Sequence, residues 1–428
     1  MARPGEPKLR KDLSFFYVLL SGIGVILGAG IYAVIGKGAA VAGNSLWLSF
    51  VIGAVIASFT GLSYAELSSA FSRDAAEYNY AKQAFRRKGL AFLAGLSIIL
   101  AGLMSSSTVA LGFAGYLYQL AGLPVMLGAA ALIIILSLIN FFGIRNSARF
   151  NAVGSLVEFS GLFIIILLGI GYIGRPGIDY LQSPAGFAGT MSAVTLVFFA
   201  FIGFEDIVNL SEETRNSRKV MPLVLIVSLA VCTLLYVLVA LTAVSVLSPQ
   251  QLADSHAPLA DVAAARLGPV AFPLLALIAL FATGNTALLM LIATSRVVYA
   301  IARDGSLPRA LSRVHPKRRT PHVSIALLAI LGLAAVLLNN LKSAAELTDV
   351  SIFVAYLMVN LSVIKLRFSR PGLKRGFRIP LSIGRLPVLP TLGALSCLAM
   401  LSFFDTATLL LEAALLAAGY VAYTVVTR

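Results

Sequence analysis

The chain has 428 residues, of which 59% are hydrophobic and only 12% are charged. Its mean hydropathy is +0.93. A soluble domain carries about 25% charged residues, so this composition leaves too few to cover a water-facing surface. Cys232 and Cys397 both lie inside apolar runs, which argues against a disulfide framework or a zinc site. The composition therefore predicts an integral membrane protein.

Apolar segments long enough to cross a hydrocarbon core, which takes about 20 residues each, recur along the chain. They predict twelve membrane-spanning helices, near residues 14–36, 44–68, 90–118, 122–142, 152–173, 187–211, 221–246, 270–298, 322–340, 345–366, 385–403 and 406–426. The fold is predicted to be all-α, because a lipid-exposed segment satisfies its own backbone hydrogen bonds only as a helix. The inner loops are short, so we expect one transmembrane domain over residues 1–428.

The formal net charge is +15, which by itself suggests a nucleic-acid partner. Its distribution indicates otherwise, because 29 of the 33 Lys and Arg fall on the same side as the N-terminus. Only Lys37, Arg175, Arg266 and Lys342 fall on the other side. The positive-inside rule then predicts a multi-pass protein of the cell membrane with both termini in the cytoplasm. We expect attraction to the lipid bilayer and no nucleic-acid partner.

The first predicted helix reads SGIGVILGAGIYAVIG and carries four glycines near its middle. Each glycine weakens a helix by roughly 1 kcal/mol relative to alanine. A broken backbone at membrane depth is tolerated only where it lines a cavity or is buried in protein. We therefore predict an unwound stretch at Gly28, Ala29 and Gly30 whose amide groups face a ligand. Close helix packing through Gly24 and Gly28 is the alternative.

The sixth predicted helix, VTLVFFAFIGFEDIVNL, places two carboxylates directly after a glycine and inside an apolar run. A carboxylate at this depth is costly and is by default a functional candidate. If the helix restarts after Gly203, Glu205 falls in its first turn, where the helix dipole favours an anion. That placement also gives Glu205 a purely structural explanation. Asp206 is the weaker candidate and is interpreted as a capping or packing group.

These two interruptions lie five helices apart, which is the best sequence indication of an inverted-repeat transporter with a site at mid-membrane. Such a chain divides into a first repeat (14–173), a second repeat (187–366) and two additional helices (385–426). Half-helix N-termini bind an anionic group, and the carbonyls freed in the same gaps bind a cation. An α-amino acid carries both charges close together.

The sequence resembles the amino acid–polyamine–organocation transporter superfamily over nearly its whole length. The resemblance rests on the order and spacing of several motifs: GVILGAGIY (24–32), SYAELSSAF (63–71), FFAFIGFED (198–206), EETRNSRKVMP (212–222), ARDGSLPRALSRVHPKRRTP (302–321) and FVAYLMVNLSVIKLR (353–367). It implies a leucine-transporter-type fold of two five-helix inverted repeats, with helices 1 and 6 broken at the substrate and helices 11 and 12 added.

The resemblance also implies roles for particular residues. The substrate carboxylate would meet the backbone amides of the first break, and its ammonium would meet carbonyls near Ile26, Phe199 and Ile202, beside Gly203. Phe199 matches the aromatic residue that covers the substrate in the arginine/agmatine antiporters. Glu205 matches an acidic position tied to pH dependence there. Ser105 is a candidate pocket residue, although interhelical hydrogen bonding explains it equally well.

Glu158, in the motif SLVEFSGLF, departs from the family pattern. Proton-coupled relatives often place a lysine here, where its ammonium takes the place of a sodium ion. We therefore predict that Glu158 carries the coupling proton, together with Glu205. It could instead bind Na⁺ with Gly284, Asn285 and Thr286, or be a permanently protonated acid in a helix–helix hydrogen bond. Four other acids lie near segment ends and are expected to be solvated at the interface: Glu66, Asp349, Asp405 and Glu412.

A second departure lies in RDAAEYNYA, where family members commonly carry Gly-Gly before the Tyr-x-Tyr and this chain has Ala75, Ala76 and Glu77. We expect a more helical inner loop as a result. Tyr356 is assigned to the outer gate on family position only.

The function that the sequence favours is secondary active transport of an amino acid or a related amine by alternating access, coupled to protons or to exchange. A sodium-coupled amino acid symporter and a polyamine or cationic amino acid antiporter are the alternatives. A channel would need a repeated polar filter motif, and an enzyme would need a catalytic arrangement within the helices; the sequence offers neither. No cofactor, bound metal or obligate protein partner is expected.

Overall fold

The structure is a computed structural model of the whole chain and describes residues 14–28, 30–71, 75–142, 147–212, 214–337 and 340–427. Most of these residues lie in helices. The α-helices are α1 (Phe15–Leu27), α2 (Gly30–Ala42), α3 (Leu46–Ala70), α4 (Ala76–Phe85), α5 (Lys88–Ala121), α6 (Val125–Phe142), α7 (Ser147–Gly169), α8 (Gly186–Val197), α9 (Ser217–Val246), α10 (Pro249–Asp254), α11 (Pro258–Leu267), α12 (Ala271–Arg303), α13 (His322–Leu337), α14 (Leu341–Ser369), α15 (Val388–Leu401) and α16 (Thr406–Thr427).

Five short 3₁₀ helices connect or extend them: η1 (Gly43–Ser45), η2 (Ile170–Tyr172), η3 (Phe198–Phe201), η4 (Phe204–Glu212) and η5 (Arg309–Ser312). Strands β1 (Ser382–Ile383) and β2 (Leu386–Pro387) form a small antiparallel hairpin before α15. Its register pairs Ser382 with Pro387 and Ile383 with Leu386. The hairpin and the loop helices α10 and α11 were not predicted from the sequence.

Each of the twelve predicted segments contains helix. Within the described residues, nine helical stretches are long and apolar enough to cross a membrane, the first of them running from α1 through α3. Helices α13 and α15 are apolar but shorter. The fold is therefore that of a multi-pass helical membrane protein. The twelve-span, five-plus-five arrangement and its division into repeats stay a prediction.

The outer surface of the bundle is apolar, as a surface facing lipid must be. Large hydrophobic side chains are exposed on several helices, among them Leu127, Ile135, Leu234 and Leu274. Many buried positions instead carry serine, threonine or a carboxylate. The serine and threonine hydroxyls mostly donate to backbone carbonyls one turn earlier on the same helix. The polar groups thus gather inside the bundle, where function in a membrane protein is placed.

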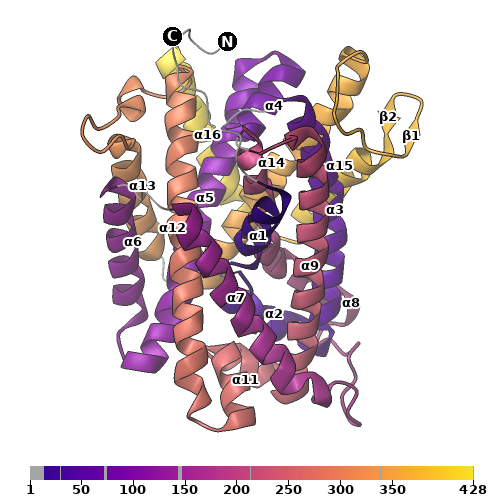
Figure 1. Cartoon of the computed structure of the whole chain (residues 1–428), viewed down its shortest axis with the longest axis vertical. Coiled ribbons are helices and arrows are strands. Elements are labelled where there is room, and N and C mark those ends of the chain that lie inside the picture. Colours follow the sequence, from indigo (N-terminus) through magenta and orange to yellow (C-terminus); the bar gives the residue numbers. More distant parts are fainter. Residues whose placement is uncertain are drawn as a thin grey trace.

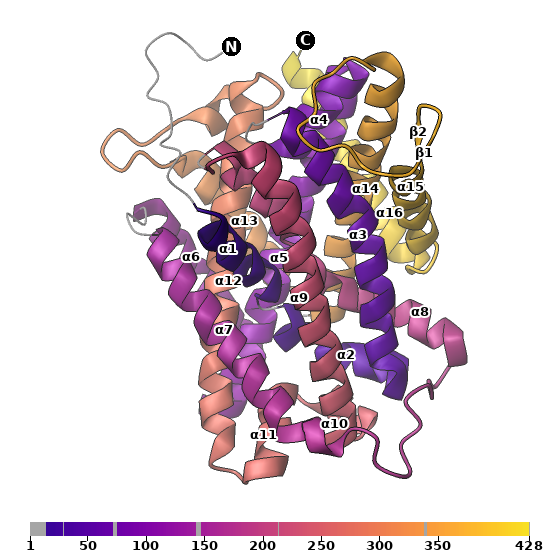
Figure 2. The ribbon, with the colours of Figure 1, turned by 45° about the vertical axis from the view of Figure 1, so that its right-hand side comes forward.

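The helices form an elongated bundle that is interrupted near its middle. Both views place α1 near the middle of the bundle and α2 below it, although the two are consecutive in the chain (Figures 1 and 2). Helix α4 and the C-terminal end of α16 lie at the upper end, and α10 and α11 lie at the lower end. We call these the α4 end and the α11 end. The break between α1 and α2 therefore lies deep within the bundle.

Candidate functional site

The first interruption falls where the sequence predicted it. Helix α1 ends at Leu27, where the amide of Gly28 donates to the carbonyl of Gly24 at 3.1 Å. Gly28 then leaves the helical conformation, with φ 9° and ψ −153°, and α2 begins at Gly30. Ala29 lies outside the described residues. The interruption of the first segment is confirmed, and α2 begins at the break with buried residues.

The second interruption lies at Ile202 and Gly203. The α-helical part of this segment ends at Val197, and η3 continues it to Phe201. Ile202 is then extended, with φ −61° and ψ 139°, and Gly203 adopts φ +116°, a region that favours glycine. The segment restarts as the 3₁₀ helix η4, where the sequence predicted a half-helix without specifying its type. A side chain at Gly203 would meet Val25 of α1, because a Cβ there would lie 2.9 Å from its Cγ1.

The two interruptions touch. A Cβ built on Gly30 would lie only 2.5 Å from the Cα of Ala200 in η3. The hydroxyl of Tyr236, in α9, bridges them: its oxygen lies 2.6 Å from the carbonyl of Ile26 and 2.8 Å from that of Ala200. The Ile26 carbonyl, predicted to hold the substrate ammonium, is therefore occupied by a side chain in this state. Sequence reasoning missed Tyr236, whose only signal is a hydroxyl in an apolar run that must find a partner.

Glu205 lies in the first turn of η4, as predicted, and is buried. Its Oε2 accepts a hydrogen bond from the amide of Gly203 at 3.0 Å and another from the hydroxyl of Tyr356 at 2.7 Å. The carboxylate therefore secures the break and joins it to α14. A first-turn carboxylate with a purely structural role would make these same hydrogen bonds. The geometry also places an acid at the edge of the break, as a functional role requires. The amide of Asp206 donates to the carbonyl of Gly203 at 3.0 Å.

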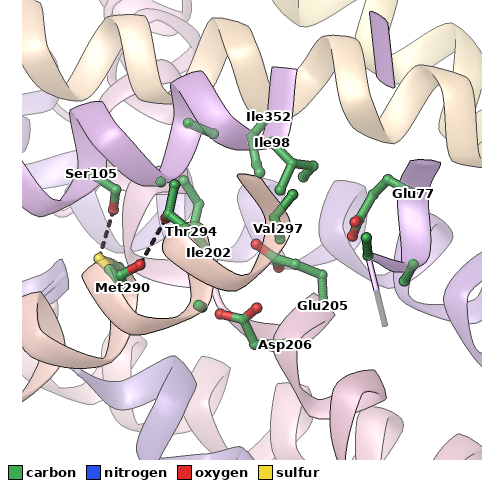
Figure 3. A pocket seen from close by; sticks show the side chains of 15 residues that line it. Glu77, Ile98, Ser105, Ile202, Glu205, Asp206, Met290, Thr294, Val297 and Ile352 are labelled. Atoms are coloured by element: carbon green, nitrogen blue, oxygen red, sulfur yellow. Dashed lines mark hydrogen bonds between the residues drawn. The ribbon is translucent and has the colours of Figure 1, made fainter. Parts of the chain in front are cut away.

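A narrow cavity of about 50 Å³ leads from the second interruption toward the α4 end. Figure 3 shows its walls: Ser105, Met290 and Thr294 lie at one end, Glu77 lies at the other, and Glu205 and Asp206 lie between them. The lining residues used below are Ser105, Ile202, Glu205, Met290 and Ile352. Ser105 lines the cavity and donates to the sulfur of Met290 at 3.0 Å. Phe199 is buried, and its carbonyl accepts from the amide of Ile202 at 3.3 Å. The structure thus brings Ser105, Ile202 and Glu205 to one cavity.

Glu158 in α7 is fully buried, and the hydroxyl of Tyr32, in α2, donates to its backbone carbonyl at 3.0 Å. The side-chain nitrogen of Asn285, in α12, donates to its Oε1 at 3.1 Å. Among the described residues, neither Glu158 Oε2 nor Asn285 Oδ1 has a hydrogen-bond partner. Thr286 reaches the break itself, since its Oγ1 would lie 2.8 Å from a Cβ on Gly28. Gly284 points elsewhere, toward the ring of Phe113. Glu158, Asn285 and Thr286 therefore cluster beside the break.

Comparison with known proteins agrees with this geometry. A sequence profile of the family described as "Amino acid permease" matches residues 13–426. The chain belongs to the amino acid permease family.

Curated relatives are transporters. The branched-chain amino acid permease BcaP of Bacillus subtilis is 32% identical over 448 aligned positions, covering 100% of this chain and 95% of that protein. The methylthioribose transporter of the same organism is 30% identical, covering 93% of this chain and 89% of that protein. The vacuolar cationic amino acid transporter 4 of Arabidopsis thaliana is 29% identical, covering 86% of this chain and 65% of that protein. Family and relatives are transporters rather than enzymes.

The acids near segment ends correct one expectation about this permease. Glu66, expected to be solvated, is buried in α3 and paired with two arginines. Arg367 of α14 donates to both of its carboxylate oxygens, at 2.9 and 2.6 Å, and Arg375 approaches within 2.8 Å. Asp349 and Glu412 are also buried, whereas Asp405 is exposed as expected. Helices α3 and α14 extend beyond the predicted segments, and neighbouring helices pack against their ends. A residue near the end of a predicted segment is therefore not necessarily exposed to water.

At the α4 end, the loop of this permease is helical, as expected from its alanines. Ala75 precedes α4 in the left-handed conformation, with φ +51°. Lys82 of α4 binds Asp304 at the end of α12, with its Nζ 2.8 and 2.7 Å from the two carboxylate oxygens, and the hydroxyl of Tyr78 donates to the same group. Partial burial raises the pKa of Asp304, but these hydrogen bonds outweigh it and hold the pKa below its usual value. The ion pair ties α4 to α12 beside the cavity.

Proposed function

We propose that this permease is a secondary active transporter that carries an amino acid or a related amine by alternating access, with the substrate bound between the two interruptions. The observation that carries the proposal is the contact of the two broken segments at Gly30 and Ala200, deep in the bundle. Because both termini are predicted to be cytoplasmic, the cavity toward the α4 end corresponds to an inward-facing state.

Recognition of the substrate would use the backbone at both breaks. The N-terminus of α2 carries amides without an intrahelical acceptor, and the helix dipole favours a carboxylate there. The carbonyls at the end of α1 and along η3 would receive the ammonium. Tyr236 bridges two of these carbonyls, at Ile26 and Ala200, so the substrate would displace its hydroxyl as it binds. Substrate binding would thus break the contact of Tyr236, and so of α9, with the two interruptions.

For the substrate, we propose first an amino acid with an apolar side chain. The cavity next to the second break is lined by Ile98, Ile202, Met290, Val297 and Ile352, which suit such a side chain. The name of the relative BcaP, a branched-chain amino acid permease, supports this choice.

A cationic amino acid is the second candidate substrate. Three carboxylates also line the cavity: Glu77, Glu205 and Asp206. The relative named as a cationic amino acid transporter is consistent with this alternative. Antiport with a cationic amino acid or polyamine would then replace symport.

For coupling, we propose that Glu158 takes up and releases a proton as the site alternates. A buried carboxylate is costly when charged, and protonation removes the charge before the helices repack around it. One of its oxygens is held by Asn285, which leaves Oε2 to carry the proton. Sodium is the alternative, because Asn285 Oδ1, Glu158 Oε2 and Thr286 are oxygen donors that a cation could share.

Counterflow in proteoliposomes tests the function. Vesicles loaded with unlabelled L-leucine should accumulate labelled L-leucine against its gradient, which a channel cannot do. An imposed proton gradient should then drive net uptake. Lack of counterflow with L-leucine, L-lysine and every other amino acid tested would refute amino acid transport.

Glu158→Gln tests the coupling. This variant mimics the protonated acid, so it should keep L-leucine binding and counterflow but lose acceleration by a proton gradient. Glu412→Gln removes another buried carboxylate, in α16, that is not among the residues lining the cavity, and should behave as wild type. Uptake that follows a sodium gradient at fixed pH and ignores a proton gradient would contradict the proton assignment.

A further inference from the structure

Asp349 of α14 has no role in the site as described so far, yet its surroundings are unusual. The side chain is 0% exposed, and neither carboxylate oxygen has a hydrogen-bond partner among the described residues. The backbone of Phe199 in η3 is close enough to interact with the carboxylate. The charged groups near it are Glu346, one turn earlier on α14, and Lys342, whose Nζ lies 3.5 Å from Glu346 Oε1. Lys342 is therefore already engaged by another acid.

The position of Asp349 relative to the cavity is set by helical spacing. Ile352 of α14 and Ile202 line the cavity between Glu77 at one end and Ser105 and Met290 at the other (Figure 3). Asp349 precedes Ile352 by three residues and Phe199 precedes Ile202 by three, so each lies about one turn farther from the α4 end. Asp349 and Phe199 thus form the layer directly behind the two isoleucines. When the bundle opens toward the α11 end, this layer becomes the wall of the site.

An ionised carboxylate without a partner is expensive inside a membrane protein. The cost falls when a cation binds to it, and a charge-assisted hydrogen bond to an ammonium group is among the stronger interactions available. The nearby Glu346 adds a second negative charge on the same side. The chemistry that fits this layer is therefore an alkylammonium group delivered from the α11 end.

We propose that Asp349 binds the ammonium group of the substrate when the site is open toward the α11 end, and is sealed behind Ile202 and Ile352 in the state seen here. This inference rests on the proposed function, since it names a second contact for the same substrate. It makes substrate recognition asymmetric: the α11 end offers a carboxylate, and the α4 end offers the backbone of the breaks and the cavity.

Transport from each side separately tests the proposal. Right-side-out and inverted membrane vesicles containing wild type, Asp349→Asn, Asp349→Glu or Glu412→Gln are assayed for the KM of L-leucine and L-lysine. Asp349→Asn should raise the KM at least tenfold from the α11 end and leave it within twofold from the α4 end. Asp349→Glu keeps the charge and should recover most of the affinity. Glu412→Gln, at a buried carboxylate that does not line the cavity, should match wild type from both sides.

The two substrates separate the sources of the ammonium group. If Asp349→Asn raises the KM from the α11 end for both L-leucine and L-lysine, Asp349 binds the α-ammonium group. If it raises the KM for L-lysine alone, Asp349 binds the side-chain ammonium group. Both outcomes support the proposal. A KM that Asp349→Asn leaves unchanged from both sides overturns the proposal. A KM raised equally from both sides also overturns it, because a general structural defect would affect transport from the two ends alike. If wild type transports neither probe nor any other amino acid, the proposed function fails and this inference with it.

Discussion

Replacing Gly30 by alanine adds one methyl group where the two interrupted segments touch. Its Cβ would lie 2.5 Å from the Cα and 3.1 Å from the Cβ of Ala200, whereas ordinary contact begins at 3.4 Å. The first of these atoms is backbone, so α2 and η3 must separate by about 0.9 Å, the difference between 3.4 and 2.5 Å. Overpacking of this kind costs about 1–3 kcal/mol. If the bound state bears that cost, substrate affinity falls roughly 5- to 150-fold, since 1.4 kcal/mol is tenfold.

The assay compares Gly30→Ala with Gly61→Ala, a buried helical glycine whose Cβ would meet its nearest atoms at 3.9 and 4.0 Å. Affinity for the amino acid that stabilises wild type most is measured by calorimetry, and uptake is measured in proteoliposomes. Gly61→Ala should bind within twofold of wild type. Gly30→Ala should remain monodisperse in size-exclusion chromatography yet lose affinity and uptake. Wild-type affinity in a well-folded Gly30→Ala would refute the claim that close contact of the breaks forms the site.

Two further substitutions test contacts that hold the site in place. Tyr356→Phe removes the 2.7 Å hydrogen bond to Glu205, so we expect a loss of about 1–3 kcal/mol in the free energy of unfolding, measured as a lower Tm, and slower uptake. An unchanged Tm would show that Glu205 finds an equal partner. Glu66→Gln leaves Arg367 and Arg375 buried without their counter-ion, and a broken buried ion pair costs about 3–5 kcal/mol. We expect poor expression or a large fall in Tm; a variant as stable as wild type would contradict the pairing.

The interruptions were predictable because glycines and carboxylates are costly within an apolar helix. Gly28 in the first segment, and Gly203 followed by Glu205 in the sixth, therefore indicated that these helices are broken. The conformation after the second break was not predictable. Whether Phe204 begins an α-helix or a 3₁₀ helix depends on packing against α1 and α3, which sequence spacing does not encode. The bridge made by Tyr236 was hidden for the same reason, because nothing in an apolar run tells which distant carbonyls are left free.

The buried charges show where reasoning from position along a helix fails. Glu66 lies near the end of its predicted segment, which suggested solvation, but its partner Arg367 is 301 residues away in the sequence. Asp349 was assigned to the interface in the same way, and the longer helix α14 places it inside the bundle instead. Glu158 was correctly singled out as a buried acid, since it lies in the middle of an apolar run. A position in the middle of an apolar run correctly predicted a buried acid, whereas a position near the end of a run did not correctly predict an exposed one.

A cryo-electron microscopy map of the permease with its most stabilising amino acid tests directly whether the substrate binds between the two interruptions. We expect density in contact with the N-terminus of α2 at Gly30 and with the backbone of η3, with the hydroxyl of Tyr236 moved from at least one of the carbonyls it now bridges. Density for the amino acid elsewhere, with Tyr236 still bridging Ile26 and Ala200, would contradict this placement of the substrate.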